Sequence, residues 1–157
     1  MFFWPRKAPP PMAPESEHVD LVEIFKSARR LELWRGRKLL AAYRVALGFV
    51  PTGHKERDGD GRTPEGIYSI DARNPRSRFH LSLRVSYPNA DDGERAARLG
   101  VPAGGDIYIH GRPNGWRKYF VGHPRRDWTT GCIAVSDPEM REIWSRVPTG
   151  ARVVVRA

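Results

Sequence analysis

Residues 107–135 read I-Y-I-H-G-R-P-N-G-W-R-K-Y-F-V-G-H-P-R-R-D-W-T-T-G-C-I-A-V, and this stretch decides which fold and chemistry we expect. It contains the single cysteine, Cys132, and two of the five histidines, His110 and His123. An unperturbed cysteine has a pKa of about 8.5, so a thiolate at neutral pH needs a nearby base or a positive field. A histidine that ends one strand and a cysteine that precedes another could supply that pair. We interpret the stretch as a nucleophilic cysteine site.

Two short strands are predicted at the ends of this stretch. Residues 106–110 alternate polar and apolar between glycines, and residues 133–135 form a short apolar run. Residues 111–131 between them are rich in Gly, Pro, Arg and Trp without any period, and a loop of that size is often functional. Gly131, directly before Cys132, permits a sharp backbone turn. The amides of these two residues could then point at a developing oxyanion.

These residues resemble the L,D-transpeptidase catalytic domain family (YkuD/ErfK type). The pattern of that family is a strand ending in His-Gly, a loop, and then Ser/Thr-His-Gly-Cys with a hydrophobic residue. Here it reads Ile109-His110-Gly111 and Thr129-Thr130-Gly131-Cys132-Ile133, and the resemblance extends from about Val19 to Val155 and includes residues 59–68. Thr130 stands where many members have a second histidine, and Ala134 stands where many have an arginine. In these departures the sequence is more similar to a branch with murein endopeptidase/amidase-like members, which leaves the acceptor open between an amine and water.

The resemblance implies a fold class that is mainly β with short helices, a β-rich α+β domain. We expect an L,D-transpeptidase-like β-sandwich with a cleft that carries the Cys/His site. It also implies a peptidoglycan L,D-transpeptidase without cofactor or metal, acting on the L-D bond of stem tetrapeptides. In that role Cys132 attacks the carbonyl, His110 takes the thiol proton, the Gly111 carbonyl orients the imidazole, and the amides near Gly131 stabilise the oxyanion. The alternatives are a murein peptide hydrolase that uses water and a non-catalytic wall-binding module, and His123 is a rival base.

The charges of the central loop are one-sided. Arg112, Arg117, Lys118, Arg125 and Arg126 face only Asp127. Such a field favours a thiolate and attracts carboxylates, which arginine can bind with two parallel hydrogen bonds. Because Ala134 replaces the usual arginine, we expect Arg112 or Arg126 to hold the carboxylate of the substrate. The remaining predicted substrate contacts are Trp128, Thr129, Thr130 and His80, with His54 and Lys55 as weaker candidates that could equally be surface residues.

The rest of the chain predicts a scaffold. Alternation of apolar residues indicates strands over 19–25, 31–34 and 38–47, with a hairpin turn at Arg35-Gly36-Arg37, and further strands over 67–70, 79–85 and 152–155. A short helix is expected over Ala90–Leu99, closed by Gly100. A second helix begins with Asp137 as its N-cap and ends before Pro148, and its apolar stripe is expected to pack in the core.

Composition limits the functional classes. The chain has 157 residues and a formal net charge of +9. Nucleic acid is the usual guess for such a balance, but no helix-turn-helix or RNA-reading motif appears, and we expect no nucleic-acid partner. Cell-wall polymer, with carboxylates and phosphates, is an equally good counter-charge. A single cysteine excludes an internal disulfide, and residues 58–61 lack the spacing of a calcium loop, so no metal site is predicted.

Residues 1–18 are predicted to be a Pro-rich, flexible tail, and residues 19–157 a single catalytic domain. The apolar run Phe2-Phe3-Trp4 is too short for a secretory signal, and we expect it to pack onto the domain. No transmembrane segment is predicted. The family leads us to expect the cell envelope or periplasm, although no signal peptide is visible, and a monomer.

Overall fold

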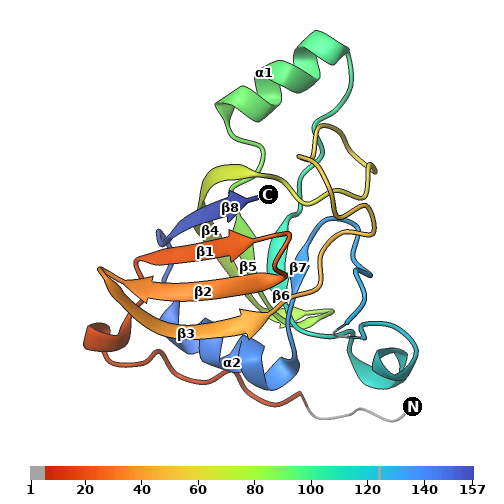
Figure 1. Cartoon of the computed structure of the whole chain (residues 1–157). Coiled ribbons are helices and arrows are strands. Elements are labelled where there is room, and N and C mark those ends of the chain that lie inside the picture. The colour runs from red at the N-terminus through yellow and green to blue at the C-terminus, as the bar shows by residue number, and fades with distance from the viewer. Residues whose placement is uncertain (1–5, 124) are drawn as a thin grey trace.

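The computed structural model describes residues 6–123 and 125–157, and across these ranges eight strands form one mixed sheet (Figure 1). The strands are β1 (Leu21–Phe25), β2 (Arg30–Arg35), β3 (Lys38–Arg44), β4 (Gly66–Ser77), β5 (His80–Val85), β6 (Tyr108–His110), β7 (Ile133–Ala134) and β8 (Arg152–Arg156). The helices are α1 (Ala90–Leu99) and α2 (Asp137–Arg146), with the short 3-10 turns η1 (Glu15–Glu17) and η2 (Gly115–Tyr119). The expected class, mainly β with short helices, is confirmed.

The sheet curls because one long strand belongs to both of its halves. The order is β3-β2-β1-β8-β4-β5-β6-β7, in which β1 and β8, and also β6 and β7, run parallel. Strand β4 pairs with β8 through residues 66–69 and with β5 from Ile70 onward. Beyond β3, Ala46 exchanges two hydrogen bonds of 2.9 Å with Ala134 of β7, so the two edges of the sheet meet. The core fills the inside of this curl.

The predicted hairpins at the start of the chain are confirmed. Strands β1, β2 and β3 pair antiparallel, with the turn at Gly36. Alternate residues of β1, Val22 and Ile24, are fully buried, as period-two patterning requires. The final strand, β8, lies between β1 and β4 and buries Val153 and Val155. It therefore joins the first hairpin to the half of the sheet that carries the site.

Both helices begin with a capping box. In this motif the side chain of the N-cap residue accepts the backbone amide of the third helical residue, and the side chain of that third residue accepts the backbone amide of the N-cap. Helix α1 has the predicted bounds; Asn89 is its N-cap, and Gly100 ends it in the left-handed conformation. The predicted cap of α2 was wrong by one residue, because the Ser136 hydroxyl accepts the Glu139 amide and Asp137 is already helical. The Asp137 carboxylate accepts the Arg112 amide instead. The apolar stripe of α2 is buried, as expected.

Residues 6–18 run along α2 at the bottom of Figure 1. The Ala13 amide donates to the Ser145 carbonyl at 2.7 Å, and the Arg141 guanidinium donates to the Ala8 carbonyl at 2.8 Å. The described part of the predicted flexible tail is therefore hydrogen-bonded to the domain. The predicted packing of Phe2-Phe3-Trp4 concerns residues outside the described ranges. In the described ranges, neither length nor apolar character lets any helix cross a membrane.

Candidate active site

Cys132 lies directly before β7, beside the start of β6. The register pairs Ile109 with Ile133, and continuing it places Cys132 opposite Tyr108. The Tyr108 amide donates to the Cys132 sulfur at 3.4 Å, and the thiol donates to the Asp106 carbonyl at 3.3 Å. The cysteine is half-buried and lines a cavity of about 230 Å³ with Lys55, Asp58, Gly59, Gly105, Asp106, Ile107 and Thr130. The thiol thus reaches a pocket from the rim of the sheet.

The backbone before the thiol is shaped by two neighbouring residues. Gly131 has a φ of 141°, and a Cβ there would lie 2.8 Å from the Arg62 carbonyl oxygen, so this position requires glycine. The buried hydroxyl of Thr129 donates to the Cys132 carbonyl at 2.7 Å and accepts the Gly131 amide at 3.2 Å. Thr129 therefore positions the cysteine, and its predicted contact with substrate stays a prediction. The Gly131 amide, predicted to face the oxyanion, is already engaged.

His110 ends β6 and is buried, with 2% of its surface exposed. Its Nδ1 lies 2.7 Å from the Gly111 carbonyl oxygen. A carbonyl can only accept, so Nδ1 carries the proton and Nε2 is the nitrogen free to take one. Phe79 stacks on the ring at a centroid distance of 4.3 Å, and Trp128 lies 5.6 Å away. Burial lowers the pKa of His110 to about 4, so the imidazole is neutral at pH 7.

The register of the parallel strands relates the two side chains. His110 pairs with Ala134, two residues beyond Cys132, so His110 and Cys132 lie on one face of neighbouring strands. The hydrogen bonds of the thiol go to backbone groups, and within the described chain none joins it to the imidazole. Gly111 allows this packing, because a Cβ there would lie 2.5 Å from the Asp137 carboxylate. The imidazole of His110 and the thiol of Cys132 therefore share a face of the sheet without a hydrogen bond between them.

The electrostatic field on the thiol differs from the predicted one. Burial raises the pKa of Cys132 to about 11, Asp106 acts in the same direction, and the Tyr108 amide and Lys55 oppose it. The expectation that the loop cations favour a thiolate is wrong. Arg126 is exposed, and the Arg112 guanidinium instead donates to the Gly122 and Lys118 carbonyls. The resting pair is therefore a neutral thiol beside a neutral imidazole.

The other predicted site residues separate into two groups. Thr130 and Lys55 line the cavity of Cys132, and Trp128 packs beside His110. The others lie elsewhere: Arg112 holds the loop, Arg126 is exposed, and His80 lines a second cavity with Asp137 and Arg141. His123, the rival base, is exposed and accepts the Arg125 amide.

Sequence reasoning missed two features of the site. The Asp106 carbonyl accepts a hydrogen bond from the Cys132 thiol. The φ of 55° at Asp106 breaks the predicted strand, so β6 begins only at Tyr108. Arg29 forms an ion pair of 2.9 Å with Asp127, which also accepts the Leu47 amide and so fixes the loop just before Trp128. Arg29 precedes β2, far away in sequence, and no local pattern indicated this pairing.

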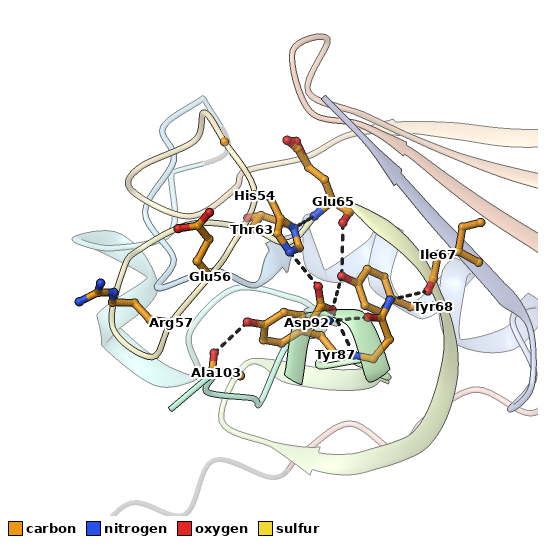
Figure 2. A network of polar contacts seen from close by, with 12 residues as sticks. His54, Glu56, Arg57, Thr63, Glu65, Ile67, Tyr68, Tyr87, Asp92 and Ala103 are labelled. Carbon is orange, nitrogen blue, oxygen red and sulfur yellow. Dashed lines mark hydrogen bonds and ion pairs between the residues drawn. The ribbon is translucent and has the colours of Figure 1, made fainter. Parts of the chain in front are cut away.

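His54 belongs to a buried network and does not line the cavity. Its Nδ1 accepts the Glu65 amide at 2.7 Å, so Nε2 carries the proton and donates to Asp92 at 2.8 Å. Figure 2 shows Asp92 of α1 also accepting the Tyr68 hydroxyl, at 2.7 Å, while the Tyr87 hydroxyl donates to the Ala103 carbonyl. Burial raises the pKa of Tyr68 and keeps it a donor. Through Asp92 the network ties α1 to the loop of His54, whose neighbour Lys55 lines the cavity of Cys132.

The fold and the site define a class: mostly-β domains that present a cysteine thiol beside a buried histidine at the rim of a curled sheet. Residues 19–155 match the family described as YkuD, L,D-transpeptidase catalytic domain. A curated relative from Escherichia coli, named "Putative L,D-transpeptidase YafK", is 34% identical over 140 residues, which are 84% of this chain and 48% of the relative. The chain belongs to the L,D-transpeptidase catalytic domain family, and the resemblance inferred from the motifs is confirmed.

Solved structures show the same fold. The helical cell shape determining protein Pgp2 from Campylobacter jejuni aligns with a TM-score of 0.67 and 23% identity over 88% of this chain and 47% of that chain. An L,D-transpeptidase from Mycobacterium smegmatis aligns with a TM-score of 0.57 and 17% identity, covering 87% and 58%. This chain spans about half the length of the curated relatives it matches, 48% of YafK.

Proposed function

We propose that this domain is a peptidoglycan L,D-transpeptidase that forms a thioacyl-enzyme on the L-D bond of stem tetrapeptides at the cell envelope. One observation carries the proposal: the Cys132 thiol lines a cavity, and the strand register puts Cys132 on the same face of the sheet as His110, whose Nδ1 is held by the Gly111 carbonyl. This leaves Nε2 as an acceptor for the thiol proton. Membership of the family supports the substrate class.

In the proposed first step, the Cys132 sulfur bonds to the carbonyl carbon of the L-D peptide bond while His110 Nε2 takes the thiol proton. The tetrahedral intermediate then breaks its carbon–nitrogen bond, and the same proton passes to the amine of the leaving D-amino acid. An amine of a second stem attacks the resulting thioester, and His110 relays the proton of that amine to the departing sulfur. One peptide bond is broken and one is formed.

The neutral resting pair determines when the proton moves. With the pKa of Cys132 raised to about 11 and that of His110 lowered to about 4, a free thiolate–imidazolium pair is strongly disfavoured before substrate binds. Proton transfer is therefore coupled to attack on the carbonyl. A slow reaction of the resting thiol with iodoacetamide at pH 7 is expected on these grounds and does not count against catalysis.

In this proposal the backbone amide of Cys132 donates the hydrogen bond that stabilises the oxyanion. The Gly131 amide is used by Thr129, whereas the Cys132 amide has no hydrogen-bond partner among the described residues. The Thr129 hydroxyl holds the peptide units on both sides of this amide, through the Gly131 amide and the Cys132 carbonyl, and so limits how far the amide can turn. A donor fixed before the reaction stabilises developing charge without reorganisation.

Product analysis tests the proposal. A stem tetrapeptide is incubated with the protein at neutral pH, and the products are separated and identified by mass spectrometry. Transpeptidation predicts release of the terminal D-amino acid together with a cross-linked dimer, and Cys132→Ala should abolish both. Release without a dimer would identify water as the acceptor and a hydrolase. An intact tetrapeptide after prolonged incubation would contradict either reaction.

A further inference from the structure

Four apolar side chains stand out of the surface at one turn of the central loop. Trp116, Tyr119, Phe120 and Val121 are exposed by 71%, 77%, 79% and 39%. The rings of Trp116 and Phe120 pack edge to face with centroids 5.7 Å apart. Large apolar side chains gathered at this exposure mark an interaction surface more often than chance. We call residues 115–121 the aromatic turn.

Hydrogen bonds to the backbone fix the conformation of the aromatic turn and so keep its side chains exposed. The Arg112 guanidinium donates to the carbonyls of Lys118 and Gly122, and the Val121 amide donates to the Arg117 carbonyl. Gly122 packs tightly, since a Cβ there would lie 2.7 Å from the ring of Pro113. The turn projects at the lower right of Figure 1, at the opposite end of the molecule from α1.

Cations surround the aromatic turn. Arg117 and Lys118 lie within it, and the Lys118 ammonium sits 5.5 Å above the Tyr119 ring. Lys118 also lines a cavity of about 470 Å³ between the turn, the N-terminal segment and α2. The charged residues that line this cavity are Arg6, Lys7, Lys118, Arg141 and Asp137. Positive charge therefore dominates the surface next to the exposed rings, and none of these residues lines the cavity of Cys132.

We propose that the aromatic turn and this basic cavity dock the protein onto the surface of an anionic phospholipid bilayer. The apolar side chains enter the boundary between headgroups and acyl chains, where Trp and Tyr are enriched in membrane proteins. Lys118 and the cavity cations contact lipid phosphates, which attract basic side chains close to the surface. The docking surface lies outside the cavity of Cys132 and does not depend on the proposed reaction.

The composition of the aromatic turn favours lipid over a glycan. A sugar-binding platform needs a flat open ring with hydrogen-bonding side chains beside it, because sugars present hydroxyls around an apolar face. Here Trp116 and Phe120 meet edge to face, and Phe120 and Val121 have no side-chain group that can form a hydrogen bond. The polar neighbours, Arg117 and Lys118, are cations suited to phosphate.

Vesicle co-sedimentation tests the proposal. The full chain is mixed with vesicles of phosphatidylcholine containing phosphatidylglycerol, and with vesicles of phosphatidylcholine alone. Binding is expected to the anionic vesicles and to weaken with salt. The double variant Trp116→Ser/Phe120→Ser should weaken binding by roughly tenfold or more, and Lys7→Gln/Lys118→Gln should reduce it and flatten its salt dependence. Cys132→Ala should bind like the unmodified chain.

The matched control is Ile67→Thr/Leu99→Ser, which removes two apolar side chains exposed by 57% and 51% away from the aromatic turn. It should leave vesicle binding unchanged. Equal binding by the aromatic variant would mean that the net charge alone attracts the vesicles, and it would overturn the proposal. The absence of vesicle binding would also overturn the proposal. If the protein bound isolated glycan strands instead and the aromatic variant lost that binding, the turn would be a glycan-binding surface.

Discussion

At the scale of single residues, His110 gives the protein a pH signature. Burial lowers its pKa to about 4, whereas a histidine in an unfolded chain titrates near 6.5. Between these values the unfolded chain binds a proton that the folded chain does not, so the free energy of unfolding falls as pH falls from about 6.5 towards 4. The loss is on the order of 3 kcal/mol. Urea unfolding at several pH values measures it.

His110→Gln is the comparison that isolates this effect, because burial also lowers the pKa of His80 and both histidines contribute to the acid slope. The variant should lose stability at neutral pH and depend less on pH between about 6.5 and 4. His80→Gln measures the other contribution separately. Parallel pH profiles for the unmodified chain and His110→Gln would show that His110 is not buried neutral.

At the scale of elements, the central loop depends on an ion pair that lies outside it. Arg29 donates to both carboxylate oxygens of Asp127, and Leu47 donates its amide to the same group. Asp127→Asn should lower the free energy of unfolding by about 1–2 kcal/mol and increase hydrogen exchange in residues 111–131. The control is Asp71→Asn, which removes the more exposed pair with Arg84 and should change little. Unchanged exchange in the loop would contradict this role for Asp127.

Helix α1 is tied to the loops through one carboxylate. Asp92 caps the first turn and accepts hydrogen bonds from His54 and Tyr68 (Figure 2). Asp92→Ala should destabilise the fold by about 3 kcal/mol, because it leaves two buried donors unpaired. Asp91→Ala removes an exposed acid from the same turn and should cost less than about 1 kcal/mol. Thermal unfolding of the two variants compares them, and equal losses would mean that the network contributes nothing beyond the helix dipole.

Helices and hairpins whose signals lie within a few neighbouring residues could be predicted from the sequence, and pairings between strands far apart in the sequence could not. Residues 90–99 carry their own cap and their own glycine stop, and the first hairpins carry their own turns. Strand β8 lies between β1, to which it is parallel, and β4, to which it is antiparallel. This placement depends on partners distant in sequence, and no local pattern indicates it. The N-cap of α2 was predicted one residue too late, at Asp137 in place of Ser136. Both residue types are good N-caps, and the sequence alone does not decide between them.

At the scale of the whole molecule, the local motifs of the site could be predicted from the sequence, and the effects of folding on the site could not. The motifs predict a site at His110 and Cys132, and the structure places both residues on one face of neighbouring strands. The contact of His110 with the Gly111 carbonyl is the one that the family resemblance implied. The direction of the thiol's pKa shift was mispredicted, because burial belongs to the folded assembly and outweighs charges counted along a loop. The two hydrogen bonds of the Thr129 hydroxyl could not be predicted either, since the sequence does not show which side of the backbone a hydroxyl occupies.

The central claim is that Cys132 becomes acylated with help from His110, and intact-protein mass spectrometry tests it most directly. The protein is mixed with a stem tetrapeptide, quenched in acid at short times and weighed. We predict an added mass on Cys132 equal to the mass of the tetrapeptide minus the mass of the released D-amino acid, which carries away the thiol hydrogen. The adduct should be absent in Cys132→Ala and should form roughly 100-fold or more slowly in His110→Ala. An unmodified protein at every time, or an adduct that persists in Cys132→Ala, would contradict the account.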